Sequence, residues 1–161
     1  MGTRILVSMA DLNIACNTDF LTTIGLGSCL GICFYDGTHK VAGMAHAMLP
    51  SSEQISNNLN KRKFVDTSIT ELITKMERAG AIRSRIAAKI FGGAQMFATT
   101  RIDDSMRIGD RNIEAVNRIL SEMRIPIIAK DVGGNYGRTI IMYAETGIVT
   151  VKTVGKGVKD L

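Results

Sequence analysis

The sequence contains a thiol and an imidazole that could act together in cysteine-dependent hydrolysis. Cys29 directly follows a Gly-x-Gly-Ser turn in "TTIGLGSCLGICFYD", and His46 interrupts the apolar stretch "VAGMAHAMLP". A free thiol has a pKa of about 8.5, and an adjacent imidazolium can lower it to between about 3.5 and 7.5, which supplies the thiolate that attacks a carbonyl carbon. We therefore predict that Cys29 is a nucleophile and that His46 is its base.

The turn in front of Cys29 is built from residues that permit unusual backbone geometry. Gly25 and Gly27 can adopt dihedral angles that other residues avoid, which would leave backbone N–H groups around Gly27 and Ser28 free to bind an oxyanion. A Gly-x-Gly pattern also occurs in dinucleotide-binding loops, but those loops need a helix to follow. Here the apolar run "CLGICFY" predicts a strand, so we do not expect a nucleotide site.

A third polar group would be needed to orient the imidazole of His46. Thr22 and Thr23 lie on the strand that enters the turn, and both are candidates. Structural interpretations exist for all of these residues. A cysteine is often a small buried hydrophobe, a histidine in an apolar strand is often a hydrogen-bonded core residue, and threonine is common in strands.

The remaining sulfur and imidazole side chains are expected to be structural. Neither Cys16 nor Cys33 follows a special turn, and His39 lies in the polar turn "GTHK", where we expect it to be solvated. Cys29, Cys33 and His46 offer only three soft ligands without C-x-x-C spacing. We therefore expect neither a metal nor another cofactor.

Length and composition predict one globular domain that covers residues 1–161. Three cysteines is an odd number, and no signal-peptide pattern is recognisable, which favours a reducing cytoplasm. The longest uncharged run, residues 20–35, is too short to span a bilayer, so we expect no membrane insertion. The net charge of +5 could attract nucleic acid, but the basic residues are dispersed apart from "KRK" at 61–63 and lack interleaved aromatics, so no nucleic acid is expected.

The predicted elements place the two candidate catalytic residues on consecutive strands. Helical spacing of apolar residues predicts one helix within 64–80 that ends at Gly80, and a second helix over 110–124 that is capped by Asp110 or Asn112. Many strands with two interposed helices predict an α/β (α+β) layered sandwich. Strands are predicted near residues 3–9, 21–24, 29–36, 40–48, 84–93, 126–131, 138–144 and 148–154.

Five blocks of the sequence, in the same order, resemble the CheD family, the chemoreceptor glutamine deamidases of bacterial chemotaxis. The resemblance implies the activity of a protein-glutamine glutaminase, which converts selected receptor glutamines to glutamate and releases ammonia. The blocks are "TIGLGSC" at 23–29, "GMAHAMLP" at 43–50, "GGAQMF" at 92–97, "IGDRN" at 108–112 and "GGNYGR" at 133–138.

The resemblance also implies residue roles and a fold. The family's catalytic cysteine and histidine fall on Cys29 and His46, and its orienting threonine falls on Thr23. The implied fold is a layered sandwich of mixed sheets with two or three helices, similar to the catalytic domain of the cytotoxic necrotizing factor toxins. Glycines that could shape the cleft are Gly92, Gly93, Gly133 and Gly134.

The implied partners are methyl-accepting chemotaxis receptors, as substrate, and a CheC-type phosphatase. The alternative is a non-catalytic regulatory module that docks to the same proteins. One segment departs from the family pattern: residues 51–64, "SSEQISNNLNKRKF", are polar and basic, with Phe64 where the family often has tyrosine.

Overall fold

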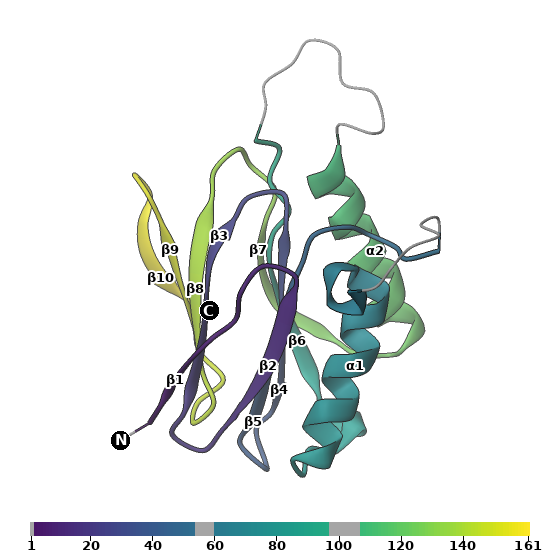
Figure 1. Ribbon diagram of the computed structural model, residues 1–161. Coiled ribbons are helices and arrows are strands. Elements are labelled where there is room, and N and C mark those ends of the chain that lie inside the picture. The colour runs from purple at the N-terminus through teal and green to yellow at the C-terminus, as the bar shows by residue number, and fades with distance from the viewer. Residues whose placement is uncertain (1, 54–59, 97–106) are drawn as a thin grey trace.

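The computed structural model describes residues 2–53, 60–96 and 107–161. In this part of the chain, two five-stranded sheets pack face to face, and two α-helices cover the free face of one of them (Figure 1). The helices are α1 (Val65–Arg78) and α2 (Ile108–Glu122). The predicted layered sandwich with two helices is confirmed.

The helix-covered sheet has the strand order β2-β5-β4-β6-β7 and carries both candidate catalytic residues. All neighbouring strands in it are antiparallel except β6 and β7, which are parallel. Its strands are β2 (Asp11–Cys16), β4 (Leu30–Asp36), β5 (Val41–Ala47), β6 (Ala87–Gly92) and β7 (Ile127–Val132).

The second sheet has the order β1-β3-β8-β9-β10, with β1 and β3 parallel and the remaining pairs antiparallel. The two sheets are therefore both mixed, as predicted. The strands of the second sheet are β1 (Arg4–Leu6), β3 (Phe20–Leu26), β8 (Arg138–Tyr143), β9 (Val149–Thr153) and β10 (Gly157–Asp160).

The apolar face of α1 packs closely on the helix-covered sheet. A Cβ atom on Gly43 of β5 would lie 2.7 Å from the sulfur of Met76, so this close approach requires a glycine. Gly80 has φ +107°, and it ends the chain's helical course as the sequence predicted. The predicted core residues of the helix are all buried: Val65, Ile69, Leu72, Ile73 and Met76.

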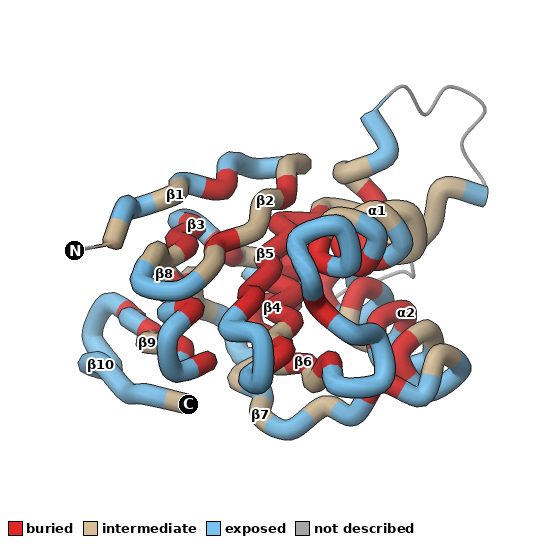
Figure 2. The backbone as a smooth tube through the Cα atoms, turned by 90° about the horizontal axis from the view of Figure 1, so that it is seen from below, coloured by how far each residue is buried: buried red, intermediate tan, exposed pale blue. Residues whose placement is uncertain are grey.

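A second cluster of buried apolar residues lies between the sheets, and Figure 2 shows buried backbone on strands of both sheets. The cluster includes Leu26 from β3, Met44 from β5 and Ile140 from β8, each with 0% of its surface exposed. The candidate catalytic residues lie at one end of this cluster, so they are in a largely dry environment that is bounded by both sheets.

Five details of the predicted elements were wrong. The strand predicted at 3–9 is shorter, and β2 and β10 were not predicted. Helix α2 begins at Ile108 rather than near residue 110, and its N-cap residue, Arg107, makes no side-chain cap hydrogen bond. Asn112 is buried inside the helix instead of capping it. Strand β2 pairs with the distant β5, whereas β10 pairs with the adjacent β9; the burial of neither strand alternates along its residues.

Candidate active site

Cys29 and His46 lie on the same face of the helix-covered sheet. His46 on β5 pairs directly with Gly31 on β4, and Cys29 comes two residues before Gly31, which makes it the diagonal neighbour of His46. Both side chains are buried, with 8% of Cys29 and 0% of His46 exposed. A Cβ atom on Gly31 would lie 2.8 Å from the terminal methyl of Ile140 in the other sheet, so a larger residue opposite His46 would have to displace that side chain.

Thr23 fixes the tautomer of His46. The Thr23 hydroxyl donates its one proton to the carbonyl of Val7, at 2.7 Å, and its oxygen lies 2.7 Å from His46 Nδ1. Because the proton is already used, Thr23 must accept from Nδ1–H. The lone pair of the neutral ring is then on Nε2, which is buried and has no hydrogen-bond partner among the described residues.

The two threonines left open by the sequence have different partners. The hydroxyl of Thr22 donates to the carbonyl of Ile140 at 3.0 Å, across the β3–β8 pair. Only Thr23 has its hydroxyl on the ring of His46. The geometry therefore joins Thr23 to His46, with Cys29 just beyond the paired end of the neighbouring strand, and assigns Thr22 to the sheet.

Burial leaves both members of the pair uncharged at neutral pH. Burial lowers the pKa of His46 to about 4. Burial also raises the pKa of the Cys29 thiol, and a hydrogen bond from the residue's own backbone N–H opposes this only in part. The expectation that an imidazolium depresses the pKa of Cys29 is therefore not met here, because an imidazole this buried does not hold a proton at pH 7.

The turn before Cys29 has the sharp geometry that its glycines suggested. Gly25 has φ +77°, and the β3–β8 register shifts between Thr23 and Leu26. Gly27 does not have positive φ; it is constrained by space instead, since a Cβ atom there would lie 3.2 Å from the side chain of Met96. The proposed dihedral freedom is thus used at Gly25 and not at Gly27.

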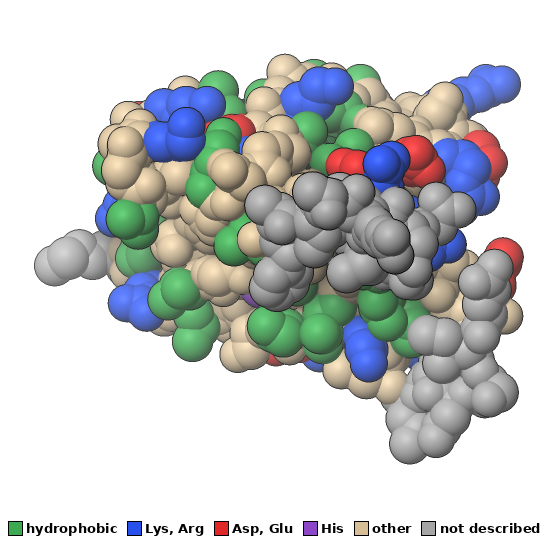
Figure 3. Space-filling model, turned by 90° about the horizontal axis from the view of Figure 1, so that it is seen from above, with side chains coloured by type: hydrophobic (Ala, Val, Ile, Leu, Met, Phe, Trp, Pro, Cys, Tyr) green, Lys and Arg blue, Asp and Glu red, His purple; other side chains and the backbone are tan. Residues whose placement is uncertain are grey.

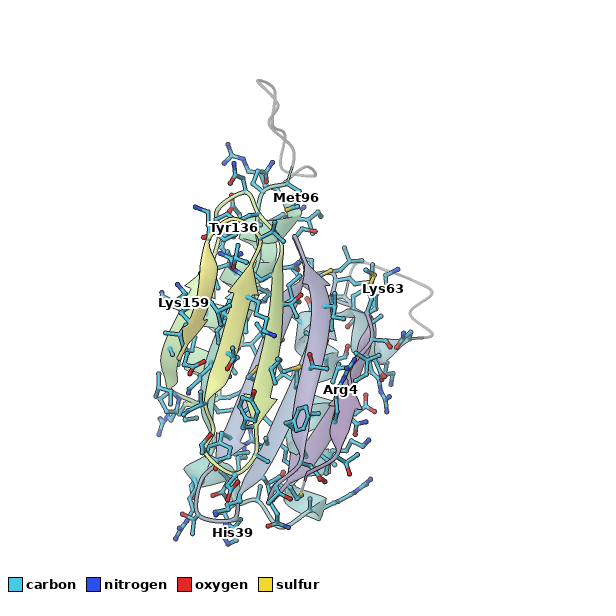
Figure 4. All side chains as sticks on the ribbon, turned by 90° about the vertical axis from the view of Figure 1, so that its left-hand side faces the viewer. Arg4, His39, Lys63, Met96, Tyr136 and Lys159 are labelled. Atoms are coloured by element: carbon cyan, nitrogen blue, oxygen red, sulfur yellow. The ribbon has the colours of Figure 1, made fainter. Side chains whose placement is uncertain are left out.

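Backbone hydrogen bonds join this turn to two glycine loops. Gly93 N–H donates to the carbonyl of Cys29 at 2.9 Å, and Gly133 N–H donates to the carbonyl of Gly92 at 2.9 Å. A Cβ atom on Gly92 would lie 2.2 Å from the Cys29 carbonyl oxygen. Residues 92–96 of the "GGAQMF" block and the "GGNYGR" block therefore meet beside the candidate nucleophile, at the end where Met96 and Tyr136 lie (Figure 4), while Phe97 lies outside the described residues.

Asn112 is a polar residue of the site that the sequence analysis assigned to another role. Its Nδ2 group donates to the carbonyl of Ser28 at 2.9 Å and to the carbonyl of Met48 at 3.0 Å. These carbonyls belong to the residue before Cys29 and to the second residue after His46. The "IGDRN" block was the available signal, but the local pattern favoured a helix cap.

The residues expected to be structural lie apart from the pair or inside the core. Cys33 is buried and Cys16 half-buried. His39 is not simply solvated, because its Nδ1 lies 2.9 Å from a carboxylate oxygen of the buried Asp36. In the "KRK" cluster, Arg62 forms ion pairs with Asp11 and Glu71. Of the segment 51–64 that departs from the family pattern, residues 54–59 lie outside the described residues.

Comparison with known proteins decides the family. A family model described as "CheD chemotactic sensory transduction" matches residues 48–153. The chain belongs to the CheD family. This match begins after Thr23, Cys29 and His46, so the family model itself says nothing about these three residues.

Curated CheD relatives match the whole chain. A protein of Lachnoclostridium phytofermentans is 50% identical over 161 residues, which is 100% of both chains. A protein of Caldanaerobacter subterraneus subsp. tengcongensis is 52% identical over 160 residues, 99% of each chain. Both are named "Probable chemoreceptor glutamine deamidase CheD".

Among solved structures, Bacillus licheniformis hypothetical protein YfiH is similar over 75% of this chain and 50% of its own, with 17% identity and a TM-score of 0.48. This similarity is too low to bear on function. Neither α1 nor α2, nor any other helix in the described ranges, is long and apolar enough to cross a membrane.

Proposed function

We propose that this chain is a chemoreceptor glutamine deamidase, a hydrolase that converts the side-chain amides of selected glutamines on methyl-accepting receptors to carboxylates. The observation that carries the proposal is the Thr23–His46 hydrogen bond beside Cys29. This arrangement occurs in a chain whose full-length relatives are named as glutamine deamidases. A thiol, an imidazole and a ring-orienting hydroxyl form the set that thiol-dependent acyl transfer requires.

The reaction starts from the neutral pair. Cys29 Sγ attacks the amide carbon of the substrate glutamine while the thiol proton passes to His46 Nε2, which has its lone pair available. The imidazolium that forms keeps its Nδ1–H on the hydroxyl of Thr23. Because burial raises the pKa of the Cys29 thiol, the thiol loses its proton during the attack and is not already a thiolate in the resting enzyme.

The remaining steps use the same groups. Backbone N–H groups at Ser28 and Cys29 are the proposed donors to the oxyanion, and each such donor is worth about 3 kcal/mol in known hydrolases. His46 returns its proton to the departing nitrogen, so ammonia leaves and a thioester forms on Cys29. His46 then takes a proton from water as the water attacks the thioester. The C–S bond breaks, and the imidazolium gives its proton to the leaving sulfur, so the products are glutamate and the free thiol.

Recognition of the receptor is proposed to use the end of the sandwich where the turn lies. That face shows a mixture of hydrophobic and basic side chains, with acidic ones grouped toward one side (Figure 3). Met96, beside Gly27, is 44% exposed. Such a surface suits a receptor helix with small apolar residues and acidic neighbours. The CheD relationship extends the proposal to the cytoplasm as the site of action and to a CheC-type phosphatase as a partner.

The test is intact-mass analysis of a receptor cytoplasmic fragment after incubation with the protein. Each deamidation should add about one dalton, because the amide NH₂ becomes OH through the thioester. Cys29→Ala and Cys29→Ser should both fold and leave the mass unchanged, whereas Cys16→Ser, a half-buried matched control, should act like the wild type. Deamidation by a Cys29 variant at the wild-type rate would remove the proposed nucleophile. Loss of receptor binding by surface changes, with Cys29 dispensable for the chemotactic response, would favour the docking module instead.

A further inference from the structure

We propose that Asn112 is a positioning residue that holds Cys29 and His46 at their working separation. The inference rests on the proposed function, since it assigns Asn112 a part in the reaction of that pair. The side chain itself touches neither reacting group. It acts through the two backbone segments that carry them.

The first argument comes from where the sheet ladder stops. The pairing between β4 and β5 ends at Leu30 with Ala47. Cys29 and Met48 are the next residues on the two strands, outside the paired region. At this point the Nδ2 group of Asn112 donates to the carbonyls of Ser28 and Met48. One planar amide therefore takes the place of the missing backbone rung at the position where the nucleophile is held.

The second argument comes from the chemistry of the amide. Asn112 is buried, and both of its N–H donors are used on carbonyl oxygens that need donors. Its Oδ1 atom has no hydrogen-bond partner in the described part of the chain. The side chain therefore acts here through its two N–H donors, and a carboxylate of the same shape would direct oxygen at oxygen.

The third argument is that the amide is mounted on a rigid support. On the same helix, Ala115 and Val116 are buried in the core beneath the helix-covered sheet. One turn before Asn112, a Cβ atom on Gly109 would lie 2.4 Å from the carbonyl oxygen of Ala94. Because α2 is fixed at both places, the position of the amide is determined by packing and not by a mobile loop.

The experiment compares four purified full-length variants with the wild type. Asn112→Asp keeps the shape of the side chain and loses the NH₂ group, and with it both N–H donors. Asn117→Asp is the matched control on the exposed face of α2. Asn112→Ser removes the amide without adding a charge, and it serves if the Asp variant does not fold. Leu120→Ala lowers stability from the same helix without touching the site. Thermal unfolding identifies the temperature at which every variant is folded.

At that temperature, kcat for receptor deamidation should fall about 100-fold in Asn112→Asp with KM little changed, because displacement of a reacting group by about 1 Å has an effect of that size. Asn117→Asp and Leu120→Ala should keep the wild-type kcat. Loss of activity in the Asn112 variants only in proportion to their unfolded fraction, as in Leu120→Ala, would overturn the proposal.

A second measurement needs no receptor. The rate of Cys29 alkylation by iodoacetamide is measured as a function of pH. Each protein is compared with the same protein carrying His46→Gln, and the difference between the two rates is the part that depends on His46. This part should be present in the wild type and in Leu120→Ala, and lost in Asn112→Asp. If it persists in Asn112→Asp, the positioning role is refuted. If the wild type lacks the His46-dependent part of the rate, the proposed Cys29–His46 pair is refuted. This outcome differs from the one that refutes only the positioning role of Asn112.

Discussion

The two histidines lie at opposite ends of the sandwich, and their hydrogen-bond partners differ in charge. At one end His46 is fully buried, with its Nδ1 2.7 Å from the hydroxyl of Thr23. At the other end, where Figure 4 labels it, His39 is 36% exposed, and its Nδ1 lies 2.9 Å from the carboxylate of Asp36. One ring meets a neutral oxygen and the other a charged one.

The difference separates a candidate base, His46, from a histidine with a structural role, His39. Burial alone would raise the pKa of Asp36, but the N–H of Ile82 and hydrogen bonds from His39 outweigh it and hold that pKa below its usual value. A carboxylate anchored in this way accepts hydrogen bonds from Thr38 N–H and from His39, and closes the 36–39 turn. A hydroxyl cannot neutralise an imidazolium at rest, so His46 stays neutral and its Nε2 lone pair remains available.

The largest contrast is expected when each imidazole is removed. His46→Gln should lower kcat/KM for receptor deamidation about 10³- to 10⁴-fold, since general acid–base catalysis has contributions of that order. His39→Gln should leave kcat/KM within about twofold of the wild type, because the turn lies at the far end of the molecule. Steady-state kinetics of the two variants measure this contrast. Equal losses would mean that the two ends do not differ as the geometry indicates.

The next effect concerns stability against pH. In the unfolded chain His46 has a pKa of about 6.5, and in the native chain burial lowers its pKa to about 4. Above pH 6.5 the ring is neutral in both states. As the pH falls from 6.5 to 4, only the unfolded state takes up the proton, so the native state loses about 3 kcal/mol of unfolding free energy. This loss should be absent in His46→Gln. Urea unfolding of both proteins at pH 7 and pH 4 measures this loss. An identical pH dependence of the two unfolding free energies would show that folding does not lower the pKa of His46.

A smaller effect is expected at the opposite end, and on stability alone. Asp36→Asn should reduce the unfolding free energy by about 2 kcal/mol, because one carboxylate oxygen that accepts from Ile82 N–H and His39 would become an amide nitrogen. The kcat for deamidation should not change. Urea unfolding and kinetics on the same preparation test both statements. A fall in kcat would reveal coupling between the ends that the structure does not suggest.

The smallest effect is expected for the partner of the base. Thr23→Val keeps the shape and removes the hydroxyl, and it should lower kcat about tenfold, as loss of a group that orients a histidine does in other enzymes. Thr23→Ser keeps the hydroxyl and should keep most of the activity. The pH profile of kcat/KM should shift only in the valine variant. Full activity and an unchanged profile in Thr23→Val would remove the orienting role from Thr23.

The pair of catalytic candidates was predictable because its signals are local. A glycine turn directly before Cys29 and one polar residue in the apolar strand of His46 both stand out within ten residues. The role of Asn112 had no such signal, since its acceptors at Ser28 and Met48 are 84 and 64 residues away in the chain.

The fold was predictable where periodicity is regular. In α1 the apolar spacing marks the buried face, and the helix was found. In β2 the most buried residues are Leu12 and Ala15, which are three apart and do not follow the alternation of a strand. All four residues of β10 are exposed, so its sequence carries no pattern at all. Both strands form because neighbouring strands offer unpaired backbone groups.

The position of β3 between β1 and β8 has a consequence for the time at which the protein becomes active. Residues 23–46 contain the candidate nucleophile, the candidate base and the candidate orienting hydroxyl, but the hydrogen bond from Thr22 to Ile140 spans 118 residues of chain. Contacts over such separations form late in folding, because the loop they close carries a large entropic cost. A nascent chain that already contains Cys29 and His46 therefore lacks the sheet that encloses them until β8 has been synthesised. We therefore expect the enclosed arrangement around the candidate nucleophile to form only when the fold is complete.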